Sequence, residues 1–120
     1  MVTRTRRRSI GPLRHRVVLR VRTDVPAPDM TLDASFSGII RRQAHVEPVT
    51  PAAYAASVQS EERVTHRVTM YFLAEVTDHH EMVFDGWVYR VRRVKHERDR
   101  DSTVLEVEQE RMVDEHRVED

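Results

Sequence analysis

The sequence predicts an all-β protein, a small β-barrel or sandwich of five to six mostly antiparallel strands with one short helix or loop insertion. Three observations support this class. Apolar and polar residues alternate with a period of two, turn-forming residues separate the alternating segments, and no internal repeat is present. The 120 residues fit one domain. We assign residues 10–111 to that domain, residues 1–9 to a flexible basic arm, and residues 112–120 to a polar tail.

The first strand is expected between residues 13 and 22, where apolar residues occupy the odd positions. Its even positions are mostly basic and should face solvent: Arg14, Arg16, Arg20 and Arg22. Residues 23–37 contain two prolines and three aspartates, which is typical of a loop with room for a short edge strand. A second strand is expected from Gly38 to Val46, and Glu47-Pro48 should end it, because proline cannot donate to the ladder.

A short helix is expected after this strand, because Thr50 can cap it and Pro51 suits the first helical position. The helix would cover Ala52 to Gln59, which is too short to be stable alone. Two alternatives stay open. The segment could be a mobile loop that orders only in an assembly, or a helix packed over one barrel mouth through Tyr54 and Val58.

Three further strands are expected in the second half. The strongest alternation runs from Val64 to Phe72. Residues 82–84 and 87–94 should form a hairpin around Asp85-Gly86, a pair that suits a type I′ turn. A charged turn over residues 96–102 leads to the last strand, residues 103–109. There Leu105 and Val107 should face inward, and Glu106 and Glu108 outward.

Composition restricts the classes of function. The 20 basic and 20 acidic residues cancel, so binding of nucleic acid through net charge is not indicated. Nearly all basic residues are arginine, and Lys95 is the one lysine. Arginine suits pairing with carboxylates at interfaces, but a coding bias explains the excess of arginine equally well. The absence of cysteine excludes disulfides and thiolate chemistry. No apolar run could span a bilayer or act as a secretory signal, so we expect a soluble protein made in a cytoplasm.

No residue pattern indicates catalysis, a cofactor or a metal site. Neither a nucleophile motif of the GxSxG type nor a glycine-rich phosphate loop is present. His79 and His80 are adjacent, and neighbours on a strand point to opposite faces and seldom chelate one ion. His15 and His66 fall on apolar strand faces, where a core or interface role is expected. We therefore expect a protein that is not an enzyme.

One pattern suggests a nucleotide site. Arg4 and Arg8 form R-x-x-x-R, and Asp33, Ser35 and Gly38 form D-x-S-x-x-G. Together they resemble the cyclic-di-GMP motif of PilZ domains, which are also small barrels. Arginines could grip the phosphates and guanine while the second motif shapes the floor. Coincidence in an arginine-dense segment is the competing explanation.

A longer series of motifs runs through residues 10 to 110. It comprises Ile10-Gly11 with Leu13-Arg14-His15-Arg16-Val17, then residues 44–48 (AHVEP), 65–70 (THRVTM) and 84–91 (FDGWVYRV), and finally Leu105-Glu106. In this order the motifs resemble the opening I-G-x-L-R-H-R strand, the A-x-V-E-P, the later strand and hairpin, and the closing strand of the phage head–tail joining family, also called head–tail adaptor or head-closure proteins. Gln43 stands where the family often has Trp, and residues 23–38 depart from its usual connection.

The resemblance implies a structural protein of the virion neck, in a phage or a phage-like particle such as a gene transfer agent, assembled in the bacterial cytoplasm. Six or twelve copies would form a ring between a portal or adaptor protein and a tail terminator or tail tube protein. Double-stranded DNA would pass through the lumen without sequence recognition, and members that act as stoppers close the channel with a loop after packaging. No membrane is implied. A tail terminator or completion ring is the nearest alternative.

Two sets of residues follow from this expectation. The variable segment between the second and third strands would carry the channel-facing residues, namely Tyr54, Ser57, Gln59, Glu61, Glu62 and Arg63. Charged strand faces would form the ring interface through arginines of the first strand and glutamates of the last strand of a neighbour, namely Arg14, Arg16, Arg20, Arg22, Glu106, Glu108 and Glu110. A solvated strand face is the simpler explanation for the second set.

Overall fold

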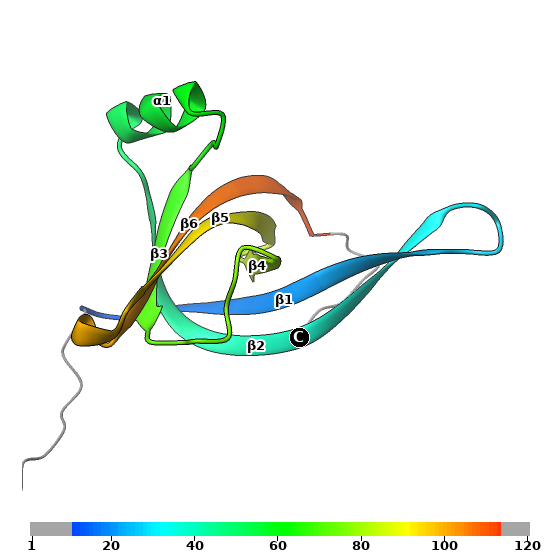
Figure 1. The fold of residues 1–120 in the computed structure, drawn as a ribbon, viewed down its shortest axis with the longest axis horizontal. Helices are drawn as coiled ribbons and strands as arrows, with labels where there is room; N and C mark the ends of the chain where they lie inside the picture. The colour runs from blue at the N-terminus through cyan, green and yellow to red at the C-terminus, as the bar shows by residue number, and fades with distance from the viewer. Residues whose placement is uncertain (1–10, 114–120) are drawn as a thin grey trace, which may run out of the picture.

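The computed structural model describes residues 11–113, and within them six antiparallel strands close into a barrel with the order β1-β2-β3-β6-β5-β4 (Figure 1). The predicted all-β class is therefore confirmed. The proposed basic arm (1–9) and nearly all of the polar tail (112–120) lie outside the described residues. The elements are β1 His15–Pro26, β2 Leu32–Pro48, α1 Pro51–Gln59, β3 His66–Tyr71, β4 His80–Phe84, β5 Trp87–Glu97, the 3₁₀ turn η1 Arg98–Arg100 and β6 Ser102–Met112.

The barrel interior is filled by the apolar residues that the period-two pattern selects. Val17 and Leu19 of β1, Val68 and Met70 of β3, and Leu105 and Val107 of β6 are all at most 1% exposed. Burial of each such side chain contributes roughly 1.5–3 kcal/mol to folding. One polar side chain, Thr103, is also fully buried, and its Oγ1 accepts a hydrogen bond of 2.9 Å from the backbone N–H of Leu73. That bond fixes the chain where it leaves β3.

The hairpin between β4 and β5 turns at Asp85-Gly86, as predicted. The φ angles of the two residues are 52° and 80°, and both central positions of a type I′ turn require positive values. Phe84 pairs with Trp87 across the turn. The turn therefore fixes the register that carries Val88, Tyr89 and Val91 into the core.

The expectation of a loop over residues 23–37 is wrong. β1 and β2 continue to pair as far as Pro26 and Leu32, and form a two-stranded ribbon that projects beyond the barrel, here called the hairpin arm (residues 22–38; Figure 1). The prolines do not prevent this, because Pro26 ends β1 and Pro28 lies in the turn, where neither interrupts the ladder. The turn is closed by a 2.8 Å hydrogen bond from Ala27 N to Thr31 O.

The expectation that Arg20 faces solvent is also wrong. A β-bulge between Leu19 and Val21 shifts the register with β2 and interrupts the alternation on which the prediction depended. The residue is only 3% exposed, and its Nε donates a 2.7 Å hydrogen bond to Glu81 Oε2. Its guanidinium carbon lies 3.7 Å from the centroid of the Phe36 ring. Arg20 therefore joins the root of the hairpin arm to the barrel.

Candidate assembly surfaces

The segment between β2 and β3 carries α1 as a projection from the barrel (Figure 1). The predicted helix start is confirmed: Thr50 Oγ1 accepts a 3.2 Å hydrogen bond from Ala53 N, and Pro51 occupies the first turn. At the other end, Glu62 N bonds Ser57 O and Glu61 N bonds Val58 O. This pair of bonds is a Schellman motif, with Glu61 at a φ of 67° in the place where glycine is usual.

No residue of α1 is buried, so the expectation that the helix packs over a barrel mouth is wrong. Tyr54 and Val58, which were to hold it there, are 41% and 39% exposed. The segment is tied at its base instead: Val49 N donates to Thr65 O at 3.0 Å. Val64 N donates to Ser57 Oγ, also at 3.0 Å. A projection held at its base and free along its length can change conformation without disturbing the core.

The structure places the six predicted channel-facing residues on this one projection. Five of them are exposed: Tyr54, Gln59, Glu61, Glu62 and Arg63. Ser57 is half-buried, and its hydroxyl donates to Tyr54 O and accepts from Val64 N, just before β3. Glu62 Oε2 lies 3.8 Å from Arg93 Nη2 of β5, an exposed ion pair that crosses from the projection to the barrel. This exposed pair adds only a weak contact near the base of the projection.

The predicted ring-interface residues do not form one patch. The three glutamates of β6 have basic neighbours in their own chain: Glu106 pairs with Arg93 at 3.2 Å, Glu110 with Arg111 at 3.3 Å, and Glu108 with Arg92. Arg22 pairs with Asp24 at 2.9 Å. Arg14 and Arg16 are exposed near the start of β1. The carboxylates of β6 thus form ion pairs within the monomer. Of the predicted interface arginines, only Arg14 and Arg16 are exposed without a described ion pair.

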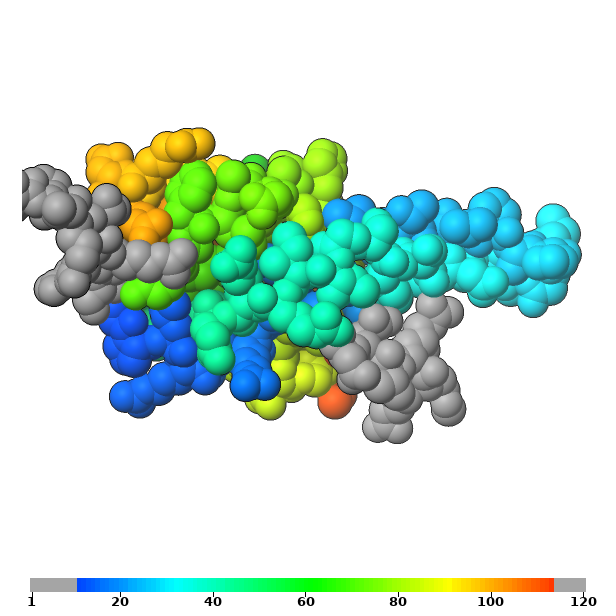
Figure 2. Space-filling view, turned by 90° about the horizontal axis from the view of Figure 1, so that it is seen from below, coloured from blue at the N-terminus to red at the C-terminus, as the bar shows by residue number. Residues whose placement is uncertain are grey.

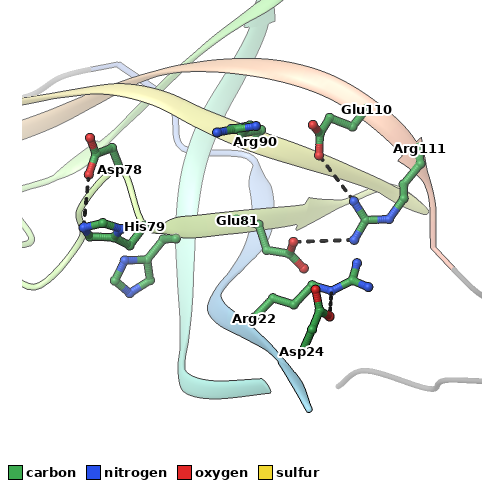
Figure 3. A pocket seen from close by; sticks show the side chains of 9 residues that line it. Arg22, Asp24, Asp78, His79, Glu81, Arg90, Glu110 and Arg111 are labelled. Carbon is green, nitrogen blue, oxygen red and sulfur yellow. Dashed lines mark hydrogen bonds and ion pairs between the residues drawn. The ribbon is translucent and has the colours of Figure 1, made fainter. Parts of the chain in front are cut away.

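A charged depression of about 490 Å³ lies at the root of the hairpin arm (Figure 3). Its centre is Glu81, whose side chain is 13% exposed and receives Arg20 at 2.7 Å and Arg111 at 3.5 Å. Acidic and basic residues alternate around it, and none of the lining residues is a serine, cysteine or lysine nucleophile. The ion pairs join β1, β4 and β6, so the depression stabilises the root of the hairpin arm against the barrel.

The histidines have structural contacts. His15 Nδ1 accepts a 3.0 Å hydrogen bond from Val46 N, and the His15 ring lies against Phe84. The ring of His66 lies edge-on to Tyr89 at 5.2 Å, and burial lowers the pKa of His66. His80 Nδ1 accepts from Thr77 N at 3.1 Å, and burial is also the main cause of its lowered pKa. Within residues 11–113, no three His, Asp or Glu side chains form a group that could hold a metal ion.

The structure describes only the second part of the cyclic-di-GMP pattern. Asp33, Ser35 and Gly38 lie on β2 within the hairpin arm and are exposed. Arg4 and Arg8 lie outside the described residues. In the part of the chain that the structure describes, no helix is long and apolar enough to cross a membrane.

The described residues therefore form a closed barrel with two exposed projections, the hairpin arm and α1. The family of phage head completion proteins matches residues 8–110, and the chain belongs to that family. Its members are structural proteins. The resemblance to head–tail joining proteins is thereby confirmed.

A solved structure of low sequence similarity has the same fold. The solution structure of protein SF1141 from Shigella flexneri 2a aligns with a TM-score of 0.61 at 13% identity. The alignment covers 83% of this chain and 95% of that one. None of the curated proteins matches the sequence.

Proposed function

We propose that this protein is the head-closure subunit of a tailed phage or a phage-like particle such as a gene transfer agent. Six or twelve copies form a ring at the virion neck, between a portal or adaptor protein and a tail terminator or tail tube protein. Double-stranded DNA passes through the lumen during packaging, and the α1 segment (residues 49–63) then closes the channel. The tail docks on the distal face.

The observation that supports gating most strongly is the exposure of α1. A nine-residue helix without one buried residue contributes little to the stability of the monomer, which is consistent with a role outside the folded core. Glu61 and Glu62 lie at its end, and their charge opposes adhesion to a passing phosphate backbone. A segment that can move without unfolding the barrel, and that DNA does not hold, suits a gate.

The test replaces residues 53–59 with a Gly-Ser linker of equal length in particles. The barrel should keep its thermal stability, because no buried side chain is removed. Packaged heads should lose DNA or fail to join tails. A matched control replaces the three exposed residues of η1, residues 98–100, with Gly-Ser and should leave DNA retention intact. Particles that stay full and infectious, or transfer-competent, with the α1 linker would refute the gate.

A tail terminator or completion ring remains the alternative, and deletion of the gene separates the two. Electron microscopy of the resulting particles should show heads without tails if the protein closes the head. Tails of abnormal length on otherwise complete particles would instead assign it to the tail end.

A further inference from the structure

We propose that the tip of the hairpin arm docks on the outside of a neighbouring copy of this chain, in a basic groove formed by β1 and β2. The groove is lined by Arg16, Val17, Val18, Arg41, Arg42 and Gln43. The proposal rests on the proposed ring function and names the subunit contact that would build the ring. It replaces pairing between β1 arginines and β6 glutamates, since those glutamates already have partners in their own chain.

The hairpin arm has features that are unfavourable in an isolated monomer. A two-stranded ribbon without a supporting layer is marginally stable in water, yet this one extends well beyond the barrel (Figure 2). Its tip exposes apolar side chains: Met30 is 94% exposed, Leu32 63% and Val25 47%. Apolar side chains gathered on one projection mark an interaction site.

The arm is also acidic. Residues 23–38 contain three aspartates and no basic residue. Asp24 is paired with Arg22 near the root. Asp29 and Asp33 remain at the tip, where Asp29 Oδ1 accepts hydrogen bonds from Thr31 N and Thr31 Oγ1 and so shapes the turn. This charge opposes contact with DNA and favours a basic protein surface.

The groove has the complementary character. It has a volume of about 450 Å³, and among the described residues three arginines and no acidic residue line it. Val18, which is partly exposed, contributes an apolar part to its lining, whereas Val17 is 1% exposed and belongs to the core. Arg41, Arg42 and Gln43 also line an adjoining depression of about 640 Å³ beside Gly11, Leu13 and Tyr71, which extends the surface toward β3. Met30 and Leu32 would meet the apolar part while Asp33 meets the arginines.

The geometry requires two copies. Pro26, at the end of β1, is eight residues from Val18 in the groove, a span of roughly 27 Å along one strand. The arm therefore cannot reach its own groove while the β1–β2 pairing holds. Because donor and acceptor surfaces differ, the contact is head-to-tail, which is the type of contact that closes into rings.

Disulfide trapping tests the contact directly, because the chain has no cysteine of its own. Met30→Cys and Gln43→Cys proteins are purified separately, mixed in equal amounts at a few hundred micromolar and oxidised. A mixed disulfide dimer should form, well above the dimer yield of either protein alone. Ala55→Cys, exposed on α1, replaces Gln43→Cys in the control and should give at least about tenfold less mixed dimer. Equal yields in the two mixtures would overturn the proposal.

Charge reversal tests the pairing independently. Asp33→Arg and Arg41→Asp should each weaken self-association about tenfold in sedimentation at high concentration, and the double variant should recover it. Asp29 is left unchanged because it holds the turn. A double variant as weak as its parents would overturn the proposal. The proposal would also be overturned if this chain's residues 114–120 occupied the groove instead. In that case, removal of residues 114–120 would speed thiol labelling of Gln43→Cys, and no mixed dimer would form. Loss of DNA binding in Arg41→Asp with unchanged self-association would likewise overturn the proposal.

The same variants in particles keep this inference separate from the proposed function. If Asp33→Arg particles still carry complete rings, the arm contact is wrong while head closure stands. If the α1 linker leaves heads sealed while Asp33→Arg breaks the ring, the arm contact stands and the gate is wrong.

Discussion

Arg20 illustrates how one residue can couple two parts of the molecule. It is 3% exposed, bonded to Glu81 of β4 and stacked on Phe36 of the hairpin arm. Removing one partner of a buried ion pair leaves the other charge desolvated, which costs far more than the pair contributes. The alternation of β1 places Arg20 on the same face as Arg16 and Arg22, and only the bulge after Leu19 separates their surroundings.

We predict that Arg20→Met lowers the free energy of unfolding by about 2–3 kcal/mol, because Glu81 keeps only its longer contact with Arg111. Arg22→Met, whose ion pair is exposed, should cost under about 1 kcal/mol. Denaturant unfolding measures both. The double variant Arg20→Met/Glu81→Leu should recover more than half of the loss. Equal losses for Arg20→Met and Arg22→Met would show that burial of Arg20 is not what matters.

His66 predicts a dependence of stability on pH. Burial lowers its folded pKa below the ordinary value of 6.5, so the unfolded chain binds more protons in the range below 6.5. Stability from this group is fully present above pH 6.5 and declines as the pH falls from there through the folded pKa. Between pH 7.5 and 5.5 the melting temperature of the wild type should fall. In His66→Gln that fall should be smaller, because the imidazole whose pKa burial lowers is absent.

At the scale of elements, the two projections differ in how they are held. The hairpin arm continues the strand ladder and is anchored by the charged depression at its root. The helix α1 has no ladder and no buried side chain, so its order in the monomer depends on its caps. The local stability of α1 should therefore depend on its capping interactions rather than on packing against the barrel core.

We predict that backbone amides of α1 exchange with solvent far faster than those of β3 and β6 in the free protein. Thr50→Ala removes the N-terminal cap and should speed exchange in α1 about fivefold, corresponding to about 1 kcal/mol. Glu61→Gly relieves the positive φ at the Schellman position and should slow exchange by a similar factor. Barrel amides should not change in either variant. Protection of α1 equal to that of the barrel in the wild type would contradict this account.

Elements whose pattern reflects burial were predicted correctly from the sequence. The core strands, the Asp85-Gly86 turn and the Thr50-Pro51 helix start all carry local signals that tertiary structure does not override. The sequence analysis predicted a loop in place of the hairpin arm, because it gave more weight to proline and aspartate content than to the apolar–polar alternation in residues 32–37 (LDASFS). That alternation was the available signal for the arm. Partners of the β6 glutamates could not be predicted, since pairing depends on the β5–β6 register and on bulges that no local pattern reveals.

For the whole molecule, few large apolar side chains of residues 11–113 are exposed outside the two projections, and the glutamates of β6 have basic neighbours in their own chain. Obligate interfaces are larger and more apolar than this surface provides. Self-association in free solution should therefore be weak, and assembly should depend on a template that gathers the copies. A portal-side partner would act as that template.

We predict that the purified protein is monomeric or weakly associated at micromolar concentration, and that rings form on the portal-side partner. Size-exclusion chromatography with light scattering measures the mass, which should correspond to one chain of 14.1 kDa. A stable free hexamer or dodecamer would contradict the prediction.

Closure of the barrel also has an evolutionary consequence. The strand ring is completed by β4 returning to β1, so its register does not depend on what is inserted between β2 and β3 or beyond Val21. Doubling an inserted loop costs only about 0.6 kcal/mol in closure entropy. Lineages can therefore lengthen, shorten or recharge both projections while the barrel persists, in keeping with a shared fold at 13% identity in the Shigella protein. In the proposed ring, particles that exchange neck components would then diverge first in the hairpin arm, through which the subunits would contact one another.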